Sequence, residues 1–158
     1  MNLQIEALWE ECLTDADIQN ALAHLPKDLN ETYDRCLTRI TGQRGRIATK
    51  TLQWISAAIE PFQIQQLQEA LAVNFDTGCL ARDRLVPVKE ILRCCSNLVS
   101  QNHDGFVRFT HYSVQQYLVE QPVNVILFPD GFSQRTARLE LGQLCVAHLT
   151  SSDYGLAL

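Results

Sequence analysis

Histidine and cysteine are the side chains of this sequence with the most scope for chemistry, and both are scattered. The histidines stand at positions 24, 103, 111 and 148, and none has zinc-ligand spacing to a cysteine. The six cysteines include no C-x-x-C pair, and most of them suit the apolar faces of helices, where a free thiol behaves as a small hydrophobic group. We therefore expect reduced thiols in a cytoplasmic protein, and no metal site.

The motifs of common catalytic sites are missing from the sequence. No G-x-S-x-G nucleophile elbow occurs, and no Gly-Lys-Ser or Gly-Lys-Thr marks a P-loop. Ser113 stands two residues after His111, but no Ser/His/Asp set can be assembled, and a helix N-cap is the simplest role for Ser113. The sequence thus predicts a protein that is not an enzyme and has no cofactor of its own.

Composition predicts a globular chain. Its 158 residues are 46% hydrophobic and 20% charged, with a net charge of −5, which suits one domain of ordinary size. No apolar run approaches the roughly 18 residues of a membrane span, and residues 1–6 lack the basic start of a secretory signal. The acidic balance argues against a nucleic-acid binder.

Charge is unevenly distributed along the chain. Residues 1–34 carry eight acids against the single Lys27, whereas residues 35–50 carry five basic side chains and no acid. The basic run is either a surface for phosphate or an acidic partner, or a solvated helix face that offsets the acidic segment.

Apolar residues recur at helical spacing through the first third of the chain. The pattern predicts helices at about residues 5–13, 17–25 and 28–40, the last of them stopped near Gly42 and Gly45. We assign residues 1–44 to a helical linker subdomain.

The middle of the chain predicts a different order of elements. A helix over residues 46–59, an extended piece at 62–64, and helices near 67–71 and 88–95 precede two short strands at 98–101 and 106–109. A four-residue turn joins the strands, and a helix follows over 113–119. This is the order of a winged helix-turn-helix. We therefore predict a mainly α fold, with a winged-helix domain over residues 45–121 that includes a two- or three-stranded β-ribbon.

Residues 122–158 are assigned to a C-terminal helical extension. Helical spacing resumes after Pro129 and gives an apolar stripe at residues 137, 141, 144, 145 and 148. The stripe needs a partner surface, so the helix either docks back on the winged helix or starts a further helical element.

Four segments carry a family resemblance, in register along the chain. They are residues 25–35 (LPKDLNETYDR), 51–55 (TLQWI), 62–71 (FQIQQLQEAL) and 109–118 (FTHYSVQQYL). Together they resemble the winged-helix region of fungal NACHT-type STAND ATPases, often catalogued as the GPI inositol-deacylase winged helix and commonly followed by ankyrin or WD repeats. Asn30 and Gln116 stand where the family usually has Asp and Glu, and both changes keep the shape of the side chain.

The resemblance implies a regulatory role in signal transduction. In this family the winged helix packs on an upstream nucleotide-binding module, and the histidine at the ribbon-to-helix junction, here His111, contacts the β-phosphate of ADP and holds the inactive state. The implied partner is a NACHT ATPase module in cis or in trans, through which alone ADP or ATP is bound, with a repeat domain downstream and no membrane. A helix N-terminus favours an anion, which makes the contact physically reasonable.

Two other roles for His111 stay open. It either caps the helix that carries Ser113 or packs beside Phe109.

Two alternatives to a regulatory module remain for the whole chain. One is a DNA-binding winged helix whose recognition helix follows Pro87, although Lys89 and Arg93 offer few phosphate contacts beside Glu90. The other is self-association through exposed apolar faces, for which Trp9, Leu13 and residues 137–148 are candidates.

Overall fold

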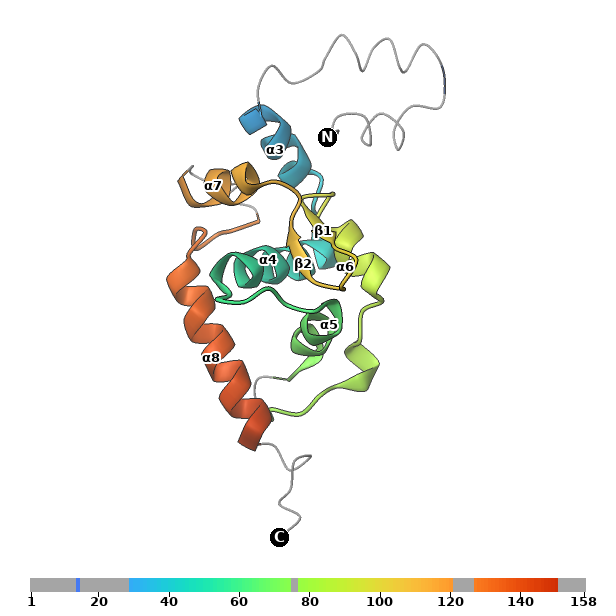
Figure 1. Cartoon of the computed structure of the whole chain (residues 1–158), viewed down its shortest axis with the longest axis vertical. Coiled ribbons are helices and arrows are strands. Elements are labelled where there is room, and N and C mark those ends of the chain that lie inside the picture. The colour runs from blue at the N-terminus through green and yellow to red at the C-terminus, as the bar shows by residue number, and fades with distance from the viewer. Residues whose placement is uncertain (1–13, 15–28, 75–76, 121–126, 151–158) are drawn as a thin grey trace.

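The structure is a computed structural model that describes residue 14 and residues 29–74, 77–120 and 127–150. The helices expected at about 5–13 and 17–25, with Trp9 and Leu13, lie outside the described residues. The elements run, in chain order, α3 (Leu29–Thr38), α4 (Gly42–Ala57), α5 (Ile64–Ala72), η1 (Arg82–Arg84), α6 (Val88–Cys94), β1 (Val99–Gln101), β2 (Val107–Phe109), α7 (Tyr112–Glu120) and α8 (Gln134–Thr150) (Figure 1).

The predicted fold class is confirmed. Helices α4, α5 and α6 are followed by an antiparallel β1–β2 hairpin, in which Val99 pairs with Phe109 and Gln101 with Val107. The segment before α5 joins this hairpin, because the Val107 N–H donates to the Phe62 carbonyl at 2.8 Å and the Ile64 N–H donates to the Gly105 carbonyl at 2.9 Å. The extended piece predicted at residues 62–64 therefore completes the ribbon of a winged helix.

The turn between the strands is built by Asn102. Its side-chain oxygen accepts hydrogen bonds from the backbone N–H groups of Asp104, at 3.1 Å, and Phe106, at 2.8 Å. Gly105 adopts a φ of +86°, a conformation that glycine adopts without strain. The turn therefore spans the four residues that the sequence predicts.

The hydrophobic core lies around α4, with α5, α6 and the ribbon packed on it. Side chains from every one of these elements are less than 2% exposed: Leu52, Trp54, Ile64, Leu67, Ile91, Leu98 and Val107. Burying an aliphatic or aromatic side chain of this size contributes about 1.5–3 kcal/mol. This shared core fixes the position of the ribbon, and with it the start of α7.

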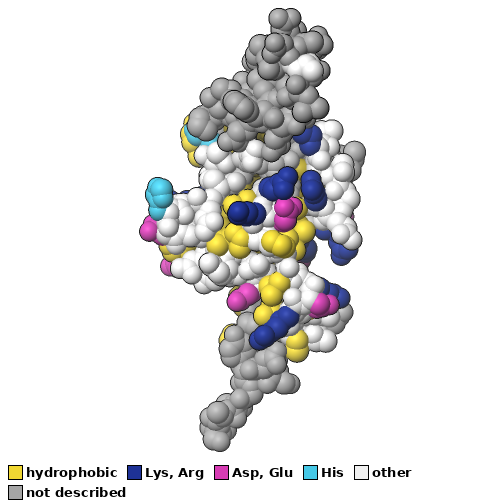
Figure 2. Space-filling model, turned by 90° about the vertical axis from the view of Figure 1, so that its right-hand side faces the viewer, with side chains coloured by type: hydrophobic (Ala, Val, Ile, Leu, Met, Phe, Trp, Pro, Cys, Tyr) yellow, Lys and Arg dark blue, Asp and Glu magenta, His cyan; other side chains and the backbone are white. Residues whose placement is uncertain are grey.

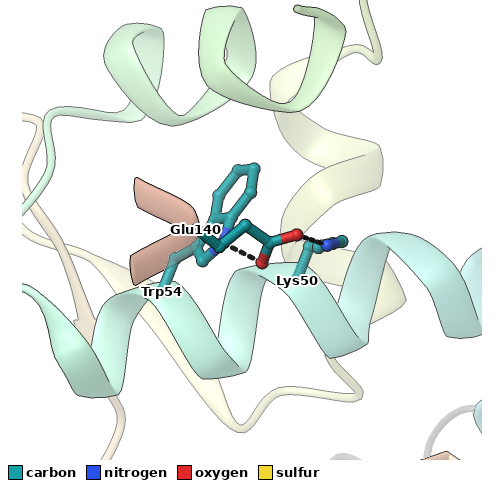
Figure 3. Close-up of polar contacts among 3 residues, drawn as sticks. All are labelled: Lys50, Trp54 and Glu140. Carbon is teal, nitrogen blue, oxygen red and sulfur yellow. Dashed lines mark hydrogen bonds and ion pairs between the residues drawn. The ribbon is translucent and has the colours of Figure 1, made fainter. Parts of the chain in front are cut away.

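Helix α8 docks back on the winged helix, which answers the question that the sequence left open. It packs against α4 at the left side of the view in Figure 1, and its residues Ala137 and Leu144 are buried in the core. A carboxylate sits in the same interface, where Glu140 accepts a hydrogen bond from Trp54 Nε1 at 2.9 Å and pairs with Lys50 Nζ (Figure 3). Burial, and next the nearby charge of Arg46, lower the pKa of Lys50.

Two details of the sequence prediction are wrong. Helix α4 begins at Gly42 and not near residue 46, so Gly45 lies inside the helix, where it is buried with Leu127 Cδ1 3.5 Å from the place of a Cβ. On α8, Cys145 is exposed although the apolar stripe predicted it to face inward, because Glu140 and Leu144 take the inward row.

In the part of the chain that the structure describes, none of the helices combines the length and the apolar character that crossing a bilayer requires.

Candidate functional site

The candidate site lies where the ribbon passes into α7. Directly after β2, the Thr110 N–H donates to the Leu98 carbonyl at 3.0 Å, and the Thr110 hydroxyl donates to the Asn97 carbonyl at 2.7 Å. Asn97 itself has a φ of +61°, a conformation that asparagine tolerates better than most residues. These bonds hold the chain at the end of the ribbon, so that His111 enters α7 from a fixed point.

His111 caps α7 with its imidazole ring. The helix begins at Tyr112, and the Val114 N–H donates to the His111 carbonyl at 3.1 Å. The backbone N–H of Ser113 donates to His111 Nδ1 at 3.2 Å, and the Ser113 hydroxyl lies 2.6 Å from the same nitrogen. The capping expected of Ser113 therefore falls to His111, and Ser113 lies in the first turn of the helix.

The His111 ring lies at the surface beside the ring of Tyr112. His111 is exposed, and its ring centroid is 4.5 Å from that of Tyr112, with the planes tilted by 40°. No hydrogen bond reaches His111 Nε2 from any residue that the structure describes. One nitrogen of the ring is thus occupied within the chain, and the other is available to a group outside it.

Helix α3 is hydrogen-bonded to this same point. The Tyr33 hydroxyl, on a side chain only 2% exposed, lies 2.7 Å from the Ser113 hydroxyl. One helical turn further along α7, the Tyr117 hydroxyl donates to the Asp34 carboxylate, and the rings of Tyr33 and Tyr117 are 5.3 Å apart. Burial, and next the bond to Asp34, raise the pKa of Tyr117.

The structure brings together His111 and Ser113, and it adds Tyr33, which the sequence did not indicate as a site residue. Tyr33 and Ser113 are 80 positions apart. The signal that could have linked them is that Tyr33 belongs to the segment 25–35 and Ser113 to the segment 109–118, two of the four segments that carry the family resemblance. The end of the first and the start of α7 in the second meet in space.

An open pocket of about 300 Å³, lined by apolar side chains and by the polar Arg108 and Gln115, adjoins the site. Tyr112 lines it together with Ile55, Ile59, Phe62 and Phe109. Ile59 is 97% exposed and Tyr112 is 73% exposed, so this surface presents apolar area to solvent.

The face that carries α6, where a DNA-binding winged helix would hold its recognition helix, is of mixed charge. Lys and Arg side chains gather there with acidic ones among them (Figure 2). On α6, Lys89 and Arg93 are exposed, and Arg93 Nη1 is paired with Glu90 Oε1 at 3.2 Å. A surface ion pair of this kind satisfies one of the few cations that the helix offers to a phosphate backbone.

The three buried cysteines of the described region are poorly suited to nucleophilic chemistry. Burial raises the pKa values of Cys36 and Cys94, and it raises the pKa of Cys95 to about 12. Thiols with raised pKa values are poor nucleophiles because little thiolate is present. Among the described residues, no group of three His, Cys, Asp or Glu side chains is arranged to hold a metal ion.

Fold and site together define a winged-helix protein. The family model for the "GPI inositol-deacylase, winged helix domain" matches residues 33–126, more than half of the sequence, and the chain belongs to this family. The match contains Tyr33, His111 and Ser113. Domains of this type are generally non-catalytic.

One curated relative extends the match. The chain is 29% identical over 142 residues to "Azaphilone pigments biosynthesis cluster protein L" of Monascus ruber, in an alignment that covers 81% of this chain and 29% of the relative. The chain thus spans less than a third of the length of that relative. No solved structure is significantly similar to the chain.

Proposed function

We propose that the chain is a non-catalytic regulatory module that packs on a NACHT-type nucleotide-binding module and helps to hold its ADP-bound, inactive state. The partner module lies either in the same polypeptide or in another one, and the proposal includes a repeat domain downstream of α8 in a longer, cytoplasmic protein. The support is the family membership together with the four motif segments that resemble NACHT-type STAND ATPases.

The position of His111 carries the proposal. The ring is exposed at the N-terminus of α7, where the positive end of the helix dipole favours an anion. Its Nδ1 is occupied by Ser113, which leaves Nε2 for a phosphate oxygen. A hydrogen bond to a charged phosphate contributes about 1.5–3 kcal/mol, which biases a two-state equilibrium by roughly ten- to a hundredfold.

The pocket beside His111 supplies the packing surface in this proposal. Tyr112 joins the two features, because its ring contacts His111 and lines the pocket with Ile59. Apolar area at the centre of an interface, with a polar contact beside it, is how stable protein contacts are commonly built.

Packing can be tested with separate polypeptides. The chain is titrated by calorimetry into an ADP-loaded NACHT-type module from a longer family member. We expect Ile59→Asp to weaken binding at least about tenfold, because a highly exposed apolar contact would be replaced by a carboxylate that loses its hydration in the interface. The control is Leu149→Asp, which places the same charge on an α8 residue that is 72% exposed and lies about three helical turns beyond Arg138, the α8 residue bonded to Ala57 beside the pocket. Equal affinity of the wild-type chain and the Ile59→Asp variant would contradict the proposed surface.

A further inference from the structure

The hydrogen bonds at the start of α7 form a continuous chain from the core to the surface. The buried Tyr33 hydroxyl lies 2.7 Å from the Ser113 hydroxyl, which lies 2.6 Å from His111 Nδ1. Hydroxyl groups both donate and accept, so these distances alone leave two directions open for the protons. In one direction Nδ1 accepts, and in the other Nδ1 carries a proton and donates.

A single backbone group decides between the two directions. The Ser113 N–H points at His111 Nδ1 at 3.2 Å, and a backbone amide can only donate. His111 Nδ1 must therefore present its lone pair, since a proton on that nitrogen would face the amide proton. It follows that the Ser113 hydroxyl donates to Nδ1 and that the Tyr33 hydroxyl donates to the Ser113 oxygen.

We infer that Ser113 and Tyr33 are positioning residues that hold neutral His111 as the tautomer with its proton on Nε2. The exposed nitrogen of His111 is then a fixed hydrogen-bond donor. A donor fits an oxyanion such as a phosphate oxygen, and it does not fit a metal ion, which needs a lone pair on the nitrogen. The identification of the anion as a nucleotide phosphate rests on the proposed function, whereas the tautomer follows from the hydrogen bonds within the chain.

This arrangement also links the site to α3. Tyr33 lies on α3 and is almost fully buried, so its hydroxyl can reach Ser113 only while α3 is packed on α7. Separation of the two helices would remove the donor that orients the Ser113 hydroxyl. The state of the α3–α7 contact is therefore communicated to the exposed nitrogen of His111.

The tautomer can be measured directly on the full 158-residue chain. Histidine side chains are labelled with ¹⁵N, and long-range proton–nitrogen spectra are recorded about two pH units above the ordinary histidine pKa of about 6.5. His103, exposed in the β1–β2 turn, serves as an internal reference. We expect His111 Nδ1 to resonate as an unprotonated nitrogen with no detectable minor tautomer, whereas His103 shows the averaged shifts of two exchanging tautomers.

Variants separate positioning from simple stability. Ser113→Ala keeps the backbone N–H that donates to Nδ1 and removes only the hydroxyl donor, so it should move the His111 shifts part of the way toward those of His103. Ser113→Thr should restore them, and Tyr33→Phe should move them by a smaller amount. Tyr117→Phe is the matched control, because it removes a tyrosine hydroxyl from the same α3–α7 contact without touching the chain of bonds to His111. Its His111 shifts should equal those of the wild-type chain.

The inference is overturned if His111 and His103 show the same tautomer ratio in the wild-type chain, or if Ser113→Ala leaves the His111 shifts unchanged. These spectra need no nucleotide-binding module. A fixed tautomer together with an unchanged ADP affinity of a His111 variant would therefore reject the proposed function alone, and an averaged tautomer with lost ADP affinity would reject this inference alone.

Discussion

At the scale of single residues, two positions accept only a particular side chain: the N-cap of α7 and Gly78 beside α8. His111 is one of them, because its Nδ1 replaces the usual serine or aspartate oxygen as the helix cap. Gly78 is another. It is buried with a φ of +68°, and a Cβ at this position would lie 2.1 Å from the carbonyl oxygen of Ala147 in α8.

We predict that Gly78→Ala lowers the free energy of unfolding by about 2–4 kcal/mol, through backbone strain and the clash with α8. The control is Gly142→Ala, within α8, where nothing lies within 4 Å of the new Cβ and φ is not positive. That change should raise the free energy of unfolding by up to about 1 kcal/mol. Urea denaturation of both variants measures the difference. Equal stability of the two would show that the backbone at Gly78 does not lie against Ala147 of α8.

At the scale of elements, the attachment of α8 is the feature that most extends the winged helix. The helix contributes Ala137 and Leu144 to the core, and Arg138 Nε donates to the Ala57 carbonyl at 3.2 Å. Its central polar contact is Glu140, which receives both Trp54 Nε1 and Lys50 Nζ (Figure 3). An apolar seam with polar contacts at defined positions specifies the register of a packed helix.

We predict that Glu140→Ala destabilises the chain by about 1–3 kcal/mol, because the buried Trp54 N–H loses its acceptor. Glu140→Gln should cost less, since its amide oxygen can still accept that bond. The control Glu69→Ala, on an exposed position of α5, should stay within about 0.5 kcal/mol of the wild-type chain. The measurement is chemical denaturation followed by tryptophan fluorescence. A loss no larger than that of the Glu69 variant would mean that Glu140 does not help to hold α8 on α4.

Periodicity predicted most of these elements, and its failures have a physical cause. The helices over residues 64–72 and 88–94 and both strands fall close to where local pattern places them, because each has its own apolar face and its own turn residues. The start of α4 and the outward side of Cys145 were missed. Gly45 lies inside α4 against Leu127, and Glu140 faces inward because it accepts a hydrogen bond from Trp54, 86 positions earlier in the chain.

The candidate site was predictable to a similar extent. His111 and Ser113 were indicated by their place between strand and helix and by the motif around them. The role of Tyr33 was not, because a contact across 80 residues leaves no trace in local spacing. The sequence predicted Ser113 as the helix cap, but His111 accepts the capping hydrogen bond. The reason is that α7 begins at Tyr112, one residue earlier than predicted.

At the scale of the whole molecule, the winged helix is joined to its flanks by two polar seams. Helix α3 is bonded to α7 beside His111, and α8 is bonded to α4 on another part of the domain (Figure 1). In a longer protein, the segment before α3 would lead to the nucleotide-binding module and the segment after α8 to the repeat domain of our proposal. A movement of α3 away from α7 would then couple the state of the module to His111.

The measurement that tests this account most directly is made on a fusion protein in which this chain follows the NACHT-type module of a longer family member. The ADP affinity of this fusion is compared with and without His111→Ala. We predict that the variant binds ADP roughly ten- to a hundredfold more weakly, with little change for ATP, while His103→Ala leaves both affinities unchanged. An ADP affinity that is the same in the wild-type protein and in the His111→Ala variant would contradict the account.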